Sequence, residues 1–199
     1  MTVSRARSRT DRREELLEAA DRVIRRLGPS ATMDELATEA GITKPILYRH
    51  FGSKDGLYAA LAERYMRVIF AEPEERLAET HPAKRIEGAV DALLASVERE
   101  PEIFRFLHHV TSERRYAADA AGAVVRAHAA RIAQVTRTDL ERAGVDGDYA
   151  DPLAYGIVAM MQAIAAWWLE TRTIPRERLV ALITSLLWAG FRRIGQPPP

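Results

Sequence analysis

The polar and basic side chains between positions 43 and 49 are the group in this sequence best suited to a chemical task. Thr43 and Lys44 are followed, about one helical turn later, by Tyr48 and Arg49. Hydroxyl, ammonium and guanidinium groups donate hydrogen bonds to the phosphates and base edges of nucleic acids. These four residues therefore indicate contact with a nucleic acid, provided that the local structure turns them outward together.

Capping residues just upstream predict the structure that positions these side chains. Thr32 and Glu35 have the spacing of a capping box, which opens a short helix, and Gly41 suits a left-handed end to it. Thr43 can cap a second short helix, with Pro45 in its first turn, where proline is tolerated. The side of this second helix that packs inward is expected to carry Ile42, Leu47 and Phe51. Two such helices around a tight turn form a helix-turn-helix, whose second helix enters the major groove of DNA.

The remaining sequence is helical in pattern almost throughout. A helix is predicted over 11–27, and a long one follows Ser53. The residues of the long helix expected to face inward are Leu57, Leu61, Tyr65 and Val68. Later helices are expected over 83–99, 102–110, 119–143, 150–171 and 175–194. There is no alternating strand pattern of useful length, so about nine helices predict an all-α protein.

The composition excludes several classes of function. The sequence has no Cys, which excludes disulfide scaffolds, thiolate zinc sites and cysteine nucleophiles. It also lacks G-x-G-x-x-G, the P-loop, G-x-S-x-G and H-E-x-x-H, so neither an enzyme nor a cofactor is expected. His108 and His109 are adjacent and point about 100° apart on a helix, which disfavours a shared metal ion.

The basic residues are concentrated near the N-terminus. Residues 1–54 hold 11 Lys and Arg against 8 Asp and Glu, whereas the rest of the chain holds 18 against 20. The first segment of this region is a basic arm that contains Arg5, Arg7, Arg9, Arg12 and Arg13. Such an arm can touch a nucleic acid, a membrane surface or an acidic partner. No apolar segment of a signal peptide is present at the N-terminus, so a cytoplasmic location is expected.

Two C-terminal segments are more apolar than one small core requires. Residues 153–169 run without a charge, yet a membrane span needs about 20 mainly apolar residues. This segment is therefore expected to be a helix covered by a bundle or by a partner subunit, with no membrane contact. The segment 175–194 adds Leu179, Leu182, Ile183, Leu186, Leu187 and Trp188. Apolar surface of this extent indicates an interface, and a homodimer is the simplest solution.

The stretch T-K-P-I-L-Y-R-H-F-G-S-K-D-G-L-Y resembles the DNA-binding signature of the TetR family of bacterial transcriptional repressors. The resemblance covers residues 12–60. It implies a helix-turn-helix DNA-binding domain over 1–53, with three helices, and a helical ligand-binding and dimerisation domain over 54–199. Gly56 departs from the family pattern, which usually has a helix-forming acidic residue there. On propensity alone, this glycine weakens the helix start by up to about 1 kcal/mol.

The resemblance also implies roles for individual residues. Thr43, Lys44 and Pro45 would lie at the base edges, Tyr48 and His50 would contact the DNA backbone, and Lys54 would pair with a phosphate. The full set of expected DNA contacts is Thr32, Thr43, Lys44, Pro45, Tyr48, Arg49, His50 and Lys54. Most of these contacts would position the protein, and few would read sequence.

A small-molecule pocket is expected in the C-terminal domain. The candidate lining residues are Phe104, Phe106, His108, Tyr116, Met160, Met161, Ile164 and Trp168. Their side chains suit an apolar ligand, although core packing explains the same residues. The segments EPEIFRFLHHV and YGIVAMMQAIAAWWLE resemble actinobacterial TetR regulators of lipid metabolism that respond to acyl-CoA.

The expected function is therefore a dimeric repressor, released from a palindromic DNA operator by a small apolar effector such as an acyl-CoA or another lipid. Two alternatives stay open at this point. One is a helical small-molecule-binding or catalytic protein without regulated DNA release. The other is a multidrug-sensing repressor of the TetR type.

Overall fold

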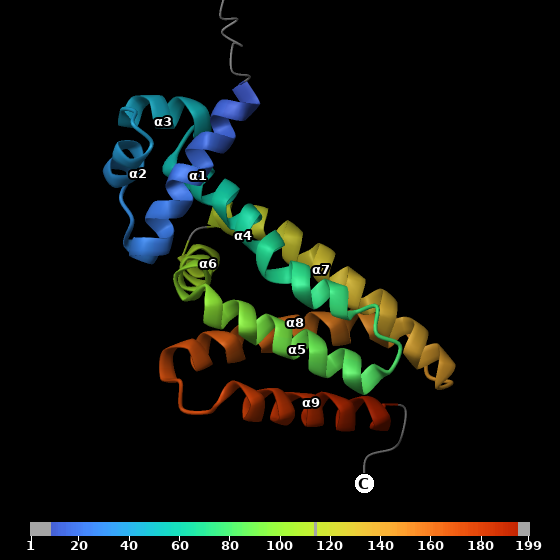
Figure 1. Ribbon diagram of the computed structural model, residues 1–199. Coiled ribbons are helices and arrows are strands. Elements are labelled where there is room, and N and C mark those ends of the chain that lie inside the picture. Colours follow the sequence, from blue (N-terminus) through green and yellow to red (C-terminus); the bar gives the residue numbers. More distant parts are fainter. Residues whose placement is uncertain (1–8, 114, 195–199) are drawn as a thin grey trace, which may run out of the picture. The chain divides into compact units, whose positions relative to one another are not determined.

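The computed structural model describes the backbone of residues 9–113 and 115–194, and the side chains of residues 12–110 and 122–194. Within these ranges the chain forms nine α-helices and no strand (Figure 1). The helices are α1 (Arg9–Leu27), α2 (Met33–Glu39), α3 (Lys44–Phe51), α4 (Lys54–Arg76), α5 (Pro82–Arg99), α6 (Pro101–Glu113), α7 (Arg115–Arg142), α8 (Ala150–Thr171) and α9 (Arg176–Arg193). Two short 3-10 helices, Gly28–Ser30 and Gly147–Tyr149, precede α2 and α8. The all-α prediction is confirmed.

The chain divides into two compact units. One consists of Met1–Tyr65 and Glu102–Ala121, and the other of Met66–Pro101 and Gly122–Pro199. Helices α4 and α7 therefore each contribute to both units. The sequence predicts a boundary between the DNA-binding and ligand-binding domains at residue 53. The compact units are defined by packing alone, so this functional boundary stays a prediction.

The N-terminal unit is built around residues that recur at helical spacing in α1 and α4. Leu16, Val23 and Ile24 of α1 are buried. Tyr58 and Tyr65 of α4 meet the ring of Phe106 from α6 edge-on, at centroid distances of 5.0 and 5.8 Å. Aromatic pairs favour this geometry, and all three rings are almost fully buried. Helix α6 thus completes the core of the helix-turn-helix unit.

The buried face of α4 differs from the expected one at Val68. Leu57, Leu61 and Tyr65 are buried as predicted, but Val68 is 54% exposed. After Tyr65 the buried stripe continues with a four-residue step to Ile69 instead of a three-residue step to Val68. Both steps lie on one helical face, and the sequence alone does not choose between them.

The C-terminal unit places α5 alongside α9 and α8 (Figure 1). The turn between α8 and α9 is fixed by the indole of the buried Trp168, which donates a hydrogen bond to the carbonyl of Ile174 at 2.7 Å. Arg176, at the start of α9, pairs with Asp91 and Glu98 of α5 at 3.1 and 3.0 Å. These contacts set the path of the last two helices.

The backbone at Gly56 lies very close to the backbone of the preceding helix, which the sequence did not indicate. A Cβ at this position would collide with the backbone carbonyl oxygen of Phe51, although helix propensity alone favours alanine by about 1 kcal/mol. We expect Gly56→Ala to lower the free energy of unfolding by about 1–3 kcal/mol, as overpacked sites do, in urea denaturation. Gly88→Ala, whose Cβ would make ordinary contacts with Arg76, is the control and is expected to be neutral or stabilising. A stabilised Gly56→Ala variant would contradict the prediction.

Candidate nucleic-acid interface

The first helix of the helix-turn-helix starts at a complete capping box. The backbone N–H of Glu35 donates to Thr32 Oγ1 at 3.3 Å, and the Glu35 carboxylate accepts from the Thr32 backbone N–H at 2.8 Å and from its hydroxyl at 2.7 Å. These hydrogen bonds to Thr32 hold the pKa of Glu35 below its usual value. Thr32 is exposed and forms this cap, so it fixes where α2 begins.

The turn that follows brings the two helices together. Gly41 adopts φ +64°, a conformation that favours glycine, and the N–H of Ile42 returns to the carbonyl of Ala37 at 3.0 Å. Ala37 and Leu36 from α2 and Leu47 from α3 are buried. This packing leaves the opposite side of α3 available to solvent.

The structure places seven of the eight expected DNA-contacting residues in or beside α3, with Thr32 at the start of α2. Thr43, Pro45 and Arg49 are exposed, and Lys44, Tyr48, His50 and Lys54 are half-buried. Thr43 is the N-cap residue of α3 and makes no side-chain cap hydrogen bond. The Lys54 ammonium lies 5.0 Å from the centre of the Tyr58 ring. The arrangement presents hydroxyl, ammonium and guanidinium groups around the first two turns of one helix.

Two further residues around this helix, Asp34 and Tyr58, were missed by sequence reasoning, and Arg13 was expected there only as part of the basic arm. Asp34 of α2 accepts a hydrogen bond from Lys44 Nζ at 3.0 Å, and this bond raises the pKa of Lys44. Arg13 of α1 lies over the ring of Phe51, 5.0 Å from its centre. Tyr58 is buried and donates to the carbonyl of Ala31 at 2.8 Å, which ties α4 to the residue before the N-cap of α2. Opposite charges on the two helices of the motif were the signal for Asp34.

The basic arm is described only in part. Arg5 and Arg7 lie outside the described residues, and so does the side chain of Arg9. Arg12 belongs to α1, where it pairs with Glu15 at 2.7 Å. The predicted contact of the arm with DNA stays a prediction.

The residues expected to line a ligand pocket are divided between the two units. Phe104 and Phe106 are buried in the N-terminal unit, where His108 is exposed. Met161 and Trp168 are buried in the C-terminal unit, and Met160 and Ile164 are half-buried there. The side chain of Tyr116 lies outside the described residues. Their joint role as a pocket stays a prediction.

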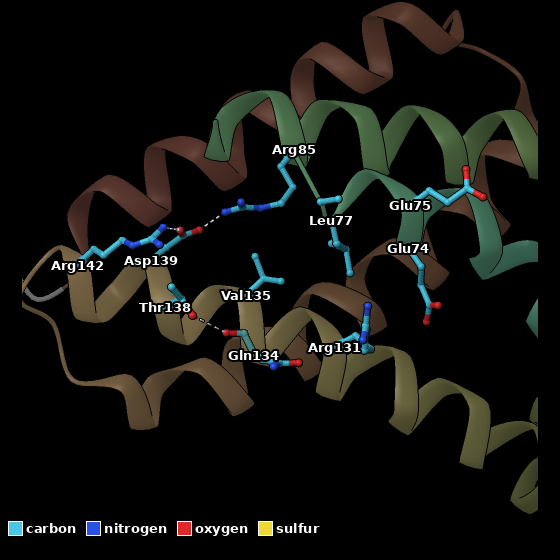
Figure 2. A pocket seen from close by; sticks show the side chains of 11 residues that line it. Glu74, Glu75, Leu77, Arg85, Arg131, Gln134, Val135, Thr138, Asp139 and Arg142 are labelled. Atoms are coloured by element: carbon cyan, nitrogen blue, oxygen red, sulfur yellow. Dashed lines mark hydrogen bonds and ion pairs between the residues drawn. The ribbon is translucent and has the colours of Figure 1, made fainter. Parts of the chain in front are cut away.

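A cavity of about 560 Å³ is present elsewhere in the C-terminal unit. It is lined by the end of α4, the start of α5 and the second half of α7, and by none of the expected pocket residues. Arg85 of α5 points toward Asp139 of α7 and pairs with it, and Arg131 points into the cavity from α7 (Figure 2). Arg85 also donates to the carbonyl of Glu79 at 2.7 Å. Most of the residues in this lining are polar or charged, unlike those of the apolar pocket that was expected.

His128 of α7 packs against α4 next to this cavity. Its ring stacks on that of Phe70, with 4.1 Å between the ring centres, and its Nδ1 lies 3.3 Å from the carboxylate of Glu74, which lines the cavity. Burial lowers the pKa of His128, and the neighbouring Glu74 opposes this with a smaller effect. The folded protein therefore favours the neutral ring.

The depressed pKa of His128 predicts a pH-dependent stability. Below its ordinary value of 6.5, the unfolded chain binds a proton that the folded chain resists, so stability falls as pH falls through that value. Above it, the contribution is fully present. We expect His128→Phe, which keeps the stacking on Phe70, to flatten the unfolding free energy between pH 5 and 6.5 in denaturant titrations at fixed temperature, roughly the range over which histidine titrates. Equal slopes in both proteins would contradict this assignment.

The last two helices expose large apolar side chains. Tyr155 and Trp167 of α8 and Leu182 and Leu186 of α9 all face solvent in the single chain. Among the described residues, Gly147–Thr171 is the one segment long and apolar enough to cross a membrane, and a third of its most apolar stretch is buried. Core helices of proteins that never enter a membrane can have the same length and composition.

Comparisons with known proteins agree with the fold and the helix-turn-helix. The family model "Bacterial regulatory proteins, tetR family" matches residues 16–61, and the model "Tetracyclin repressor-like, C-terminal domain" matches residues 74–196. The chain is 30% identical over 191 residues to the HTH-type transcriptional activator FasR of Mycolicibacterium smegmatis, covering 94% of this chain and 85% of FasR.

Solved structures of the same kind cover nearly the whole chain. A TetR-like regulator from Rhodococcus sp. RHA1 has a TM-score of 0.65 at 23% identity, over 94% of this chain and 98% of that one. FadR from Bacillus subtilis, solved in complex with stearoyl-CoA, has a TM-score of 0.69 at 12% identity, over 89% and 98%. At these identities the structures establish a shared fold.

Proposed function

Because this chain belongs to the TetR family of transcriptional regulators, we propose that it is a cytoplasmic homodimeric repressor that leaves a palindromic DNA operator when an acyl lipid such as a long-chain acyl-CoA binds. The exposed polar face of α3 is the observation that carries the DNA-binding part of this proposal. Thr43, Pro45 and Arg49 are solvent-exposed on a helix whose other side is buried against α2.

The contacts with DNA follow from the docking geometry of a helix-turn-helix. The N-terminal residues of the second helix lie at the base edges, which assigns Thr43, Lys44 and Pro45 to sequence reading. Tyr48, Arg49, His50 and Lys54 are placed later and are assigned to the phosphate backbone, with Thr32 at the start of α2. Phosphate contacts set affinity and its salt dependence, and base contacts set specificity.

The exposed apolar faces of α8 and α9 support the dimer. Packing these faces against their copies would remove Tyr155, Trp167, Leu182 and Leu186 from water. A twofold axis would then relate the two copies of α3, the reading helix, which is the helix proposed to enter the major groove. Such dimers read half-sites about 34–36 Å apart, one turn of DNA. An effector that prefers a different spacing of the two reading helices weakens DNA binding by its differential affinity for the two states.

The identity of the effector is proposed from two resemblances. The α6 and α8 segments resemble lipid-responsive regulators, and FadR of the same fold was solved with stearoyl-CoA. Met160, Met161, Ile164 and Trp168 of α8 supply apolar side chains of the kind that line such sites. Transcription in vitro from a promoter beside the operator gives the sign of regulation: we expect repression that the acyl-CoA relieves.

Fluorescence anisotropy on an operator recovered by random-sequence selection tests the proposal. We expect tight binding that weakens steeply with salt and is reversed by stearoyl-CoA. Arg49→Ala should reduce the steepness of the plot of log K, the association constant, against log salt concentration by about 0.9. It should also weaken binding about fivefold near 0.15 M salt, as loss of one phosphate contact does. Arg126→Ala, an exposed arginine of α7, is the control and should leave both values unchanged. Failure to bind any duplex at low salt would reject the proposed function.

A further inference from the structure

One cation of the proposed reading helix is held by a carboxylate of the neighbouring helix. Lys44 is the first residue of α3 and Asp34 lies in the first turn of α2, and their charged groups are 3.0 Å apart. Both side chains are solvent-accessible, at 41% for Lys44 and 74% for Asp34. The pair therefore sits on the surface of the helix-turn-helix, at the end of α3 expected to meet the bases.

This placement changes what Lys44 can do on DNA. A free lysine is a mobile point charge that pairs with any phosphate, and each such pairing contributes a sequence-independent affinity. An ammonium that gives one of its three donors to Asp34 has two left, in directions fixed by the pair. The carboxylate also adds a negative charge at a surface that phosphates must approach. Both effects act against binding to arbitrary sequences.

We propose that Asp34 is a specificity-determining residue, which orients Lys44 toward a base edge and suppresses its indiscriminate pairing with phosphates. This inference rests on the proposed DNA-binding function and deepens it. On non-operator DNA, Asp34 lowers the affinity by about the contribution of one released counterion. On the operator, the loss is offset because Lys44 already has its donors in the direction of its base.

Two other roles of Asp34 need separating from this one. An acidic residue in the first turn stabilises α2 through the helix dipole, so its loss can act through folding. Any neutralised carboxylate also makes the unit more cationic. Glu39, at the end of α2, provides a matched control because it is also paired, with Arg22 of α1 at 2.7 Å and Arg26 at 3.8 Å. Glu39→Gln releases arginines and changes the charge equally, without touching Lys44.

The experiment measures binding of Asp34→Asn, Glu39→Gln, Lys44→Ala and Lys44→Ala/Asp34→Asn to two duplexes by anisotropy near 0.15 M salt. One duplex is the operator selected with the unaltered protein, and the other is a mixed sequence of equal length. We expect Asp34→Asn to tighten mixed-sequence binding about fivefold, the factor for one additional counterion released. Its operator affinity should change less than twofold. The ratio of the two affinities should therefore fall about fivefold.

The control variants test whether a fall in the ratio of the two affinities is due to the pair of Lys44 and Asp34. Glu39→Gln should change both affinities alike and keep the ratio within twofold. In the Lys44→Ala background, Asp34→Asn should leave the ratio unchanged, because the two residues act as a pair. An unchanged ratio in Asp34→Asn, an equal fall in Glu39→Gln, or an effect that persists without Lys44 would each overturn the inference. Failure of the unaltered protein to bind either duplex would instead reject the proposed function. Thermal melts of each variant identify any that is misfolded, and Asp34→Ser then replaces Asp34→Asn.

Discussion

Replacing Leu182 and Leu186 together by glutamate is expected to convert the proposed dimer into monomers and to abolish tight operator binding. The two side chains are 60% and 59% exposed in the single chain, so their change does little to the fold of one protomer. In a symmetric dimer, four leucines are lost from the interface. At about 1.5–3 kcal/mol for a fully buried leucine, and with more than half of each side chain involved, this removes about 4–7 kcal/mol. That is roughly a thousandfold or more in the dimer Kd, before the repulsion of four carboxylates is counted.

Sedimentation equilibrium measures this change directly. Val68→Glu is the matched control, because Val68 is also an exposed apolar residue, at 54%, but lies on α4 instead of α9. This control should stay dimeric and should bind the operator as the unaltered protein does. A Leu182→Glu/Leu186→Glu protein that remains dimeric would show that another surface forms the interface.

Asp139→Asn is expected to destabilise the C-terminal unit by about 3 kcal/mol, the loss seen when one partner of a largely buried ion pair is removed. The Asp139 and Arg85 side chains are only 16% and 11% exposed, and Arg85 is also bound to the carbonyl of Glu79. The guanidinium is therefore fixed at its site and would keep its charge with no carboxylate beside it. The loss should appear as a lower midpoint in guanidinium denaturation.

Two further variants separate the pair from its surroundings. Arg142 lies 3.9 Å from the other oxygen of Asp139 and is 75% exposed, so Arg142→Ala should change stability by less than about 0.5 kcal/mol. The double variant Arg85→Met/Asp139→Leu should recover most of the stability, because apolar side chains of similar size replace buried pairs well. An Asp139→Asn loss no larger than that of Arg142→Ala would show that solvent already screens the pair.

The helices could be predicted from sequence because their ends are marked by local chemistry. The capping box at Thr32, the left-handed Gly41 and the Pro45 in the first turn each act within a few residues. The choice of face at Val68 could not be predicted, because steps of three and four residues both keep a side chain on one helical face. Gly56 could not be predicted for a different reason: the carbonyl that it approaches belongs to the preceding helix, so the contact depends on how the two helices meet.

The candidate site could also be predicted only in part from the sequence. The outward face of α3 follows from its buried side, so the sequence could indicate the polar residues there. The pairing of Lys44 with Asp34 depends on how two helices cross, and the polar cavity depends on how α4, α5 and α7 meet. Apolar side chains such as Met161 and Trp168 fit a core, an interface or a pocket equally well by residue type. Periodicity therefore located these residues on helices without telling which of the three roles each one has.

The packing of Phe106 against Tyr58 and Tyr65 has a consequence for the order of events during synthesis. The residues up to Tyr65 emerge from the ribosome first, but the ring that closes their core lies about 40 residues later. At roughly 5–20 residues per second, the helix-turn-helix waits some 2–8 seconds with both tyrosine faces uncovered. Aromatic surface that is exposed in this interval favours aggregation, which is the hazard that chaperones counter. Fusing only the first 65 residues to another protein would make that exposed state permanent.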